Sequence, residues 1–240
     1  MPKYRIAGLL IEILPRYPLV DRVCEKYRVD TEEDPDFSVS ISEEEIIAVT
    51  QSFPEYSLPY AENYCVCRRV SSEAAARGAV LFHAAAIEVD GRAYAFSAPS
   101  GTGKSTHIML WRRRFGKRVG MINGDKPFLR EKDGVFTVYG SPWCGKEGWN
   151  RNTSAPLAGV CFLYQAKENT ISVMDAASAT PRVFAQLIKP DTAEGVAGCL
   201  QFADRLIRNV PIYRMGCNIS PEAAELSFRT MTGENPPDKI

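Results

Sequence analysis

The stretch Ala95-Phe96-Ser97-Ala98-Pro99-Ser100-Gly101-Thr102-Gly103-Lys104-Ser105-Thr106 is the part of this chain around which the rest is organised. It matches the phosphate-binding pattern G-x-x-x-x-G-K-[ST], except that Ala98 stands where the pattern has its first glycine. In such a loop the backbone N–H groups point inward, and the N-terminus of the following helix adds partial positive charge. Phosphate is the ligand of such a site.

The residues on either side of the loop predict a strand before it and a helix after it. Residues 92–97 form a short apolar and aromatic run after an Asp-Gly turn, which is typical of a strand, and residues 107–115 read as a helix. Gly101 and Gly103 permit backbone angles and a close approach that a Cβ would prevent. The residues predicted to hold a nucleotide are Ser100, Gly101, Thr102, Gly103, Lys104, Ser105 and Thr106.

Phosphate-binding loops of this kind work with Mg²⁺, so a second acidic residue is expected nearby. Lys104 is predicted to reach the β- and γ-phosphates, and the hydroxyl of Ser105 to ligate the metal. Residues 118–122 form a second short apolar run that ends at Asn-Gly-Asp, which makes Asp125 the other predicted metal ligand. The predicted cofactors are therefore ATP and Mg²⁺.

Composition excludes several classes of protein. The 240 residues contain 29 Lys and Arg against 29 Asp and Glu, a balance that gives no general attraction to nucleic acid or to an anionic membrane. No apolar run is long enough for a membrane span, and no secretory signal is recognised, so a cytoplasmic protein is expected. The seven scattered cysteines and two histidines favour reduced thiols over a zinc site.

The sequence predicts a mixed α/β fold with antiparallel hairpins and two regions. Residues 1–75 are expected to form a small β-rich region packed on a catalytic domain, residues 76–240. In the first region we expect strands at 4–13, 37–41 and 64–70, a short capped helix starting at Ser42, a second helix at 71–78 and core positions for Tyr56, Tyr60 and Tyr64. In the second we expect hairpins around 90–91 and 128–139, strands at 157–164 and 210–215, and helices at 181–188, 192–208 and from Ser220.

A glycine-rich stretch, residues 140–150, is predicted to be a loop, and it contains Trp143 and Trp149. Exposed aromatic residues in such loops often contact ligands, but they can equally fix the loop to the core. Both interpretations of the two tryptophans stay open from the sequence.

The loop Ser-Gly-Thr-Gly-Lys-Ser-Thr between flanking hairpins resembles the phosphoenolpyruvate carboxykinase and HPr kinase/phosphorylase group. The resemblance covers roughly residues 80–215. The chain is too short for a carboxykinase and looks more like the HPr kinase catalytic domain, or the smaller serine kinases related to it. It implies ATP-dependent transfer to a serine of a peptide or protein, and some of these kinases act on a precursor peptide. It also implies a homo-oligomer, possible reverse phosphorylase activity, and an active-site role for His83.

One position departs from that family. HPr kinases carry a pair of aspartates, the first resembling a general base and the second a metal ligand. In one register Asp125 matches the second and Gly124 stands at the first; in a register shifted by one, Asp125 is itself the base. His83 could share that task, because histidine titrates near neutral pH.

Other residues near the motif have less specific interpretations. Trp143, Lys146 and Arg151 are candidate substrate contacts, although a solvated surface charge is the preferred interpretation of Lys126 and Arg151. His83 lies in an apolar segment and could instead be a buried, hydrogen-bonded strand histidine. His107, just inside the helix, could cover the edge of the nucleotide.

Three functions are compatible with these residues. The first is an ATP-dependent kinase of a serine in a peptide or protein, with a small hydroxylated molecule such as free serine as the nearest variant. The second is a catalytically silent nucleotide-sensing partner protein, for which Gly124 is the best support. The third is phosphorolysis or hydrolysis of phosphoserine.

Overall fold

The computed structural model describes residues 2–99 and 101–236 and shows a mixed α/β protein. The helices are α1 (Pro18–Cys24), α2 (Glu43–Ser52), α3 (Leu58–Ala75), α4 (Lys104–Phe115), α5 (Ala176–Gln186), α6 (Ala193–Asn209) and α7 (Pro221–Thr232), with 3-10 turns at Glu25–Tyr27 and Gly116–Arg118. The strands are β1 (Lys3–Ile6), β2 (Leu9–Leu14), β3 (Arg28–Val29), β4 (Phe37–Ser40), β5 (Ala79–Leu81), β6 (Ala85–Val89), β7 (Arg92–Ser97), β8 (Val119–Asn123), β9 (Phe128–Lys132), β10 (Val135–Tyr139), β11 (Ser154–Gln165), β12 (Thr170–Val173) and β13 (Ile212–Cys217).

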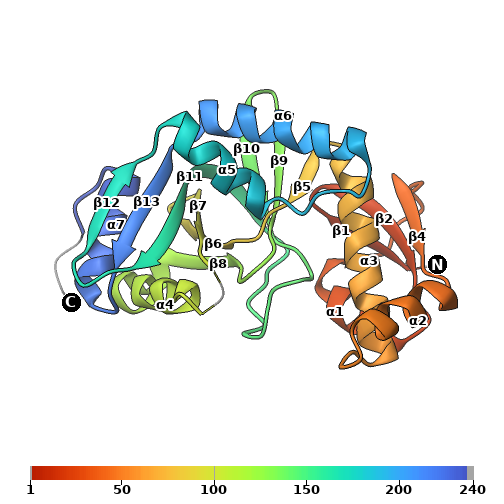
Figure 1. The fold of residues 1–240 in the computed structure, drawn as a ribbon. Coiled ribbons are helices and arrows are strands. Elements are labelled where there is room, and N and C mark those ends of the chain that lie inside the picture. Colours follow the sequence, from red (N-terminus) through yellow and green to blue (C-terminus); the bar gives the residue numbers. More distant parts are fainter. Residues whose placement is uncertain (1, 100, 237–240) are drawn as a thin grey trace.

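The larger sheet runs β5-β9-β10-β11-β7-β6-β8, with β13 and β12 continuing from β11. The long strand β11 pairs antiparallel with β10 at its start and parallel with β7 and β13 further on. Strand β11 therefore pairs with three strands, β10, β7 and β13, and the sheet curls around it. Figure 1 shows α6 across the top of the molecule. Helices α4 and α7 lie below it on the left, and the N-terminal sheet with α1, α2 and α3 lies below it on the right.

Alternation along β7 divides the core of this sheet into two layers. Ala93 and Ala95 face the cluster that includes α5 and α6, while Tyr94 and Phe96 face the cluster that includes α4 and α7. A strand buried on both faces needs apolar residues at successive positions, as this one has. The phosphate-binding loop follows β7 directly, so it lies at the edge of the sheet where the two layers meet.

The N-terminal sheet runs β3-β1-β2-β4 and is covered by helices. The predicted strand at 4–13 is wrong, because Ala7 and Gly8 both have positive φ (54° and 73°) and turn it into the hairpin β1–β2. The capped start at Ser42 is confirmed, with the complete capping box of α2.

The predicted strand at 64–70 is also wrong, since these residues lie inside the 18-residue helix α3. Pro59 occupies the first turn of the helix, where its missing N–H costs nothing. Val66, Val70 and Ala74 are buried on one face, so helical spacing rather than strand alternation satisfies the core. The helix predicted at 71–78 is the C-terminal end of α3.

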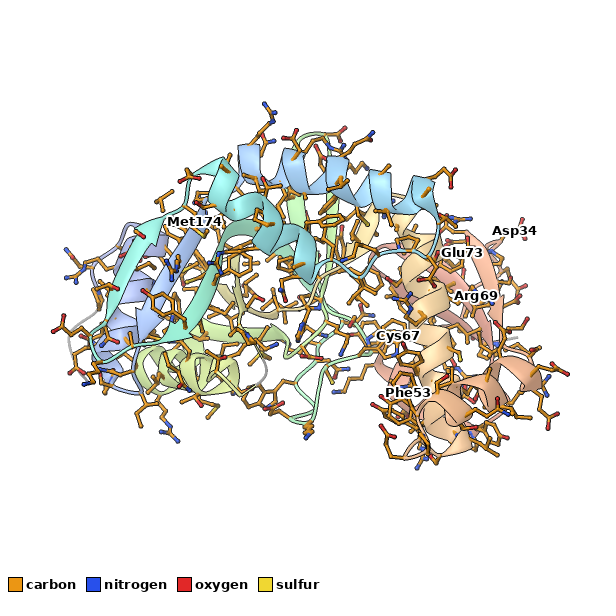
Figure 2. All side chains as sticks on the ribbon, in the orientation of Figure 1. Asp34, Phe53, Cys67, Arg69, Glu73 and Met174 are labelled. Carbon is orange, nitrogen blue, oxygen red and sulfur yellow. The ribbon has the colours of Figure 1, made fainter. Side chains whose placement is uncertain are left out.

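Of the tyrosines expected in this core, Tyr56 is partly buried and packs against it, whereas Tyr60 and Tyr64 lie at the surface. Tyr60 is 47% exposed and Tyr64 is 36% exposed. Together with Phe53 and Tyr56 they form an aromatic cluster with ring centroids 4.6–6.1 Å apart. Figure 2 shows Phe53 at the lower end of this helical layer and Cys67 on the side of α3 that faces the larger sheet.

The rest of the expected elements are confirmed. The hairpins β6–β7 and β9–β10 turn at the two Asp-Gly pairs, with Asp90 and Asp133 at positive φ. The strands at 157–164 and 210–215 and the three C-terminal helices are present with shifted ends, and β12 is an additional strand. All seven cysteines are free. Within residues 2–99 and 101–236, no helix is both long enough and apolar enough to cross a membrane.

Candidate active site

The phosphate-binding loop has the backbone that its glycines predict. Gly101 has φ +77° and Gly103, the N-cap of α4, has φ +109°; a side chain would strain both positions even though neither lacks space. The N–H of His107 donates to the carbonyl of Gly103 at 2.9 Å, which starts the helix. Ser100, the first predicted nucleotide contact, lies outside the described residues.

Asp125 is the residue on which the predicted catalytic groups converge. Its Oδ1 lies 3.2 Å from Lys104 Nζ and 3.2 Å from His83 Nε2, and its Oδ2 accepts from Lys126 Nζ. Burial raises the pKa of this carboxyl, but the hydrogen bond from His83 and the charges of Lys126 and Lys104 outweigh it and hold the pKa well below the usual range. One ionised carboxylate therefore joins the loop lysine to the histidine.

Asn123, which the sequence analysis did not single out, fixes the position of Asp125. This residue is fully buried at the end of β8, and its Oδ1 accepts from the backbone N–H groups of Asp125 and Lys126 at 2.8 and 2.7 Å. Its Nδ2 donates to the carbonyl of Ser141 at 3.0 Å. The signal that could have identified it is the tendency of asparagine to hydrogen-bond the backbone two residues ahead.

Gly124 is required by the packing of the loop at residues 140–150. Its N–H donates to the carbonyl of Trp149 at 2.7 Å, and a Cβ at this position would lie 2.7 Å from the carbonyl oxygen of Cys144. An aspartate therefore has no room beside Asp125 in this backbone. Among residues 2–99 and 101–236, Asp125 is the one carboxylate that pairs with both Lys104 and His83.

A substitution of Gly124 by alanine tests this packing. The contact with backbone, rather than with a movable side chain, should lower the free energy of unfolding by about 1–3 kcal/mol. Gly198→Ala is the control, because Gly198 is exposed in α6 with nothing within 4 Å of an added Cβ, and alanine there should stabilise by about 0.5–1 kcal/mol. Thermal denaturation of both variants measures the difference. An unchanged melting temperature for Gly124→Ala would contradict the assigned loop packing.

Glu147 is a second acidic residue at the loop, and it was not predicted. Ser105 Oγ donates to Glu147 Oε1 at 2.7 Å. Both line a cavity of about 440 Å³ that also includes His83, Lys104, Asp125 and Lys146. The described residues contain no group of three or more His, Cys, Asp or Glu arranged around a metal ion. A metal here would therefore need phosphate oxygens or water to complete its coordination.

Two of the predicted substrate contacts lie away from this cavity. Trp143 is 7% exposed, packs against Phe128 and donates from Nε1 to Asn63 at 3.3 Å, so it fixes the loop to α3. Arg151 is exposed, and its guanidinium lies over Gly120. Lys146 is the substrate candidate that lines the cavity. Trp149, partly buried against the α4 and α7 cluster, also contributes to holding the loop.

The remaining basic residues need corrections. Lys126 is not a free surface charge, since its ion pair with Asp125 raises its pKa even though burial lowers it. His83 is not a buried strand histidine, because its side chain is 38% exposed between β5 and β6. His107 is buried and bonded through Nε2 to Ser227 and Trp111, and burial lowers its pKa to about 4. It is therefore part of the core and does not cover a nucleotide.

Comparisons with known proteins place the chain in a family. Among solved structures, the Hpr(Ser) kinase/phosphatase from Coxiella burnetii matches with a TM-score of 0.36 and 9% identity, over 64% of this chain and 93% of that chain. A TM-score this low supports no inference. No curated protein matches. The family described as "SynChlorMet cassette protein ScmC" matches residues 57–225, from the start of α3 into α7. The chain therefore belongs to the ScmC family of SynChlorMet cassette proteins.

Proposed function

We propose that this chain is an ATP-dependent kinase with a phosphoenolpyruvate carboxykinase/HPr kinase-like core that phosphorylates a serine hydroxyl in a peptide or protein. The observation that carries the proposal is Asp125, which lies 3.2 Å from both the loop lysine Lys104 and His83. Phosphoryl transfer needs a phosphate clamp and a group that receives or orients the proton of the acceptor. This triad of side chains brings both together in one cavity.

The clamp consists of the N-terminus of α4 and Lys104. The first turn of α4 carries backbone N–H groups that have no partner within the helix, and Lys104 supplies a positive charge whose side chain is only 13% exposed. In a protein without ligand this charge is paired with Asp125. Phosphate oxygens arriving at the loop compete for the same ammonium group, so binding of the nucleotide partly releases Asp125.

The proton acceptor follows from hydrogen-bond chemistry. An ionised carboxylate only accepts hydrogen bonds, so the contact of Asp125 with His83 keeps the proton of the neutral imidazole on Nε2 and leaves Nδ1 as an acceptor. In the proposed step the serine oxygen bonds to the γ-phosphorus as the bond to the β–γ bridging oxygen breaks. ADP leaves with that electron pair, and the serine proton passes to His83 Nδ1.

The donor set fits Mg²⁺. The hydroxyl of Ser105 and the carboxylates of Glu147 and Asp125 are the hard oxygen ligands this ion prefers, and one or two carboxylates with phosphate oxygens are its usual protein site. When bound, Mg²⁺ would offset the negative charge of the phosphates. Ser105 and Asp125 are the ligands that we propose, with Glu147 added by its contact with Ser105.

A transfer assay tests the proposal. Purified protein, ATP and Mg²⁺ are incubated with free serine, HPr protein, and acidic, neutral and basic synthetic serine peptides, and mass spectrometry locates the phosphate. The proposal expects phosphate on a peptide or protein, and none on free serine. Phosphate on free serine would favour the small-molecule kinase. Tight binding of ATP with no phosphorylated product in any sample would count against a kinase and for the sensor.

A further inference from the structure

A second and larger cavity, of about 1010 Å³, lies beside the phosphate cavity. The two share His83, Ala98 and Pro99, so the proposed proton acceptor stands where they meet. We propose that this second cavity binds the acceptor, and that the acceptor is an acidic peptide segment. The inference rests on the proposed kinase function and names the substrate class of that same site.

The floor of this cavity is one row across the sheet. Ser97 of β7 pairs with Phe162 of β11, which pairs with Arg214 of β13, which pairs in turn with Ser172 of β12. Residues directly opposite each other on paired strands point to the same face, so these four side chains lie side by side. The row ends at Ser97, whose hydroxyl donates to the carbonyl of His83 at 3.0 Å.

Helix α5 forms the opposite wall, and it is fixed to His83. The backbone N–H of His83 donates to the carbonyl of Gln186 at 2.8 Å, and Phe82 pairs with Leu187 just beyond the helix. A ligand lying along α5 is therefore held at a defined distance from His83. Figure 2 shows Met174 where β12 passes toward α5, at the far end of the same wall.

The charge of the cavity favours an anionic ligand. Arg182 on α5 and Arg214 on β13 both line it. In the described part of the chain neither guanidinium has a carboxylate partner, and Arg214 only stacks on the ring of Tyr164, 4.5 Å from its centroid. Asp175 is the one carboxylate among the described residues that line the cavity, and it is already engaged as the N-cap of α5 with Ser178. Two guanidinium groups without carboxylate partners are suited to carboxylates of a ligand.

The size and the apolar lining favour a peptide over a small anion. The volume is at the upper end of ordinary ligand pockets, about 300–1,000 Å³. Phe162, Val173 and Met174 add apolar surface beside the two arginines. An extended segment could place acidic side chains against Arg182 and Arg214 and its serine at His83, next to the phosphates.

The test measures binding of two probes to the same protein. A short fluorescein-labelled peptide with one serine flanked by aspartates reports on the second cavity by fluorescence anisotropy, and its counterpart with lysines is the charge control. Fluorescent mant-ATP reports on the phosphate cavity. The variants are Arg182→Gln, Arg214→Gln and the double variant, with Arg229→Gln on the exposed face of α7 as the matched control.

We expect the wild type to prefer the acidic peptide, and the double variant to lose about tenfold in affinity for it while mant-ATP binding is unchanged. Equal binding of the two peptides, or no loss in the double variant, overturns the inference but not the kinase. A parallel loss of mant-ATP affinity would also overturn it, because the cavity would then hold part of the nucleotide. Absence of mant-ATP binding in the wild type overturns the kinase proposal instead, whatever the peptides do.

Discussion

Replacing Asp125 with asparagine should reduce phosphoryl transfer by about 10²–10⁴-fold, the usual contribution of a positioned acid–base group. The substitution keeps the shape of the side chain but removes the charge that Lys104, Lys126 and His83 share. An amide can donate to His83, so the proton on the ring is no longer confined to Nε2, and the acceptor at Nδ1 is lost in part of the molecules. The measurement is kcat with the acceptor that the transfer assay shows to receive phosphate.

Nucleotide binding gives this prediction its sharpest readout. Asp125 competes with phosphate for Lys104 and is also a proposed Mg²⁺ ligand, so binding is measured without Mg²⁺. Under that condition its neutralisation should leave the affinity for mant-ATP unchanged or increase it, while kcat, measured with Mg²⁺, falls. Asp133→Asn is the matched control, because Asp133 is exposed in the β9–β10 turn and asparagine tolerates its positive φ of 52°. If mant-ATP affinity and kcat fall together in Asp125→Asn, the carboxylate has a structural role and the proposed division of tasks is wrong.

The phosphate loop and its flanks could be predicted from the sequence because their chemistry is local. Gly101 and Gly103 have the positive φ that the motif requires. The strand before them has its predicted bounds, and the helix after them ends at Phe115 as predicted but begins at Lys104 rather than at 107. The hairpins at Asp90 and Asp133 have the same origin, since a two-residue turn fixes the pairing of its neighbours. Such features depend on residues that are adjacent in the chain.

The two strand predictions that failed did so for different reasons. The strand at 4–13 failed because the local turn at Ala7 and Gly8 was overlooked, whereas the run at 64–70 was decided by distant contacts. The run at 64–70 has β-branched and aromatic residues, and only the packing of Val66 and Val70 against the N-terminal sheet makes it helical. Tyr60 and Tyr64 look like core residues by type, yet the helical period places them outside. Local composition cannot decide between two periods over a run this short.

The candidate site was predictable in its residue types but not in its geometry. That Asp125 meets both Lys104 and His83 depends on β6 lying between β7 and β8, a strand order that no local signal encodes. Gly124 could not be explained either, because the carbonyl that excludes a side chain belongs to Cys144, in the following loop. Glu147 contacts Ser105 from that same loop, so this contact could not be predicted from the local sequence either.

Replacing Lys104 with alanine should have the opposite signature from Asp125→Asn, with loss of nucleotide binding as well as transfer. Lys104 is the one lysine of the loop motif, and its ammonium group is largely shielded from solvent. Removal of a single preorganised charge at transferring phosphates costs about 10²–10³-fold in rate. We expect the affinity for mant-ATP to fall as well, because the same charge acts on the bound nucleotide before transfer.

The melting temperature of Lys104→Ala should stay close to that of the wild type. This result would show that Lys104 has a role in binding rather than in the stability of the fold. Asp125 keeps His83 and Lys126 as partners when Lys104 is shortened, so no buried charge is left alone. Lys132→Ala, an exposed lysine at the end of β9, is the matched control for the loss of a lysine side chain. Melting temperatures of both variants should lie close to that of the wild type.

Lys126→Ala decides which lysine serves the phosphates. Both lysines pair with Asp125, but only Lys104 sits at the N-terminus of α4, where the loop amides converge. If the phosphates bind there, mant-ATP affinity should fall far more in Lys104→Ala than in Lys126→Ala. If the affinity for mant-ATP falls more in Lys126→Ala than in Lys104→Ala, the phosphates bind beside Lys126, on the Oδ2 side of Asp125. The loop would then not have the phosphate-binding role that the sequence motif predicts.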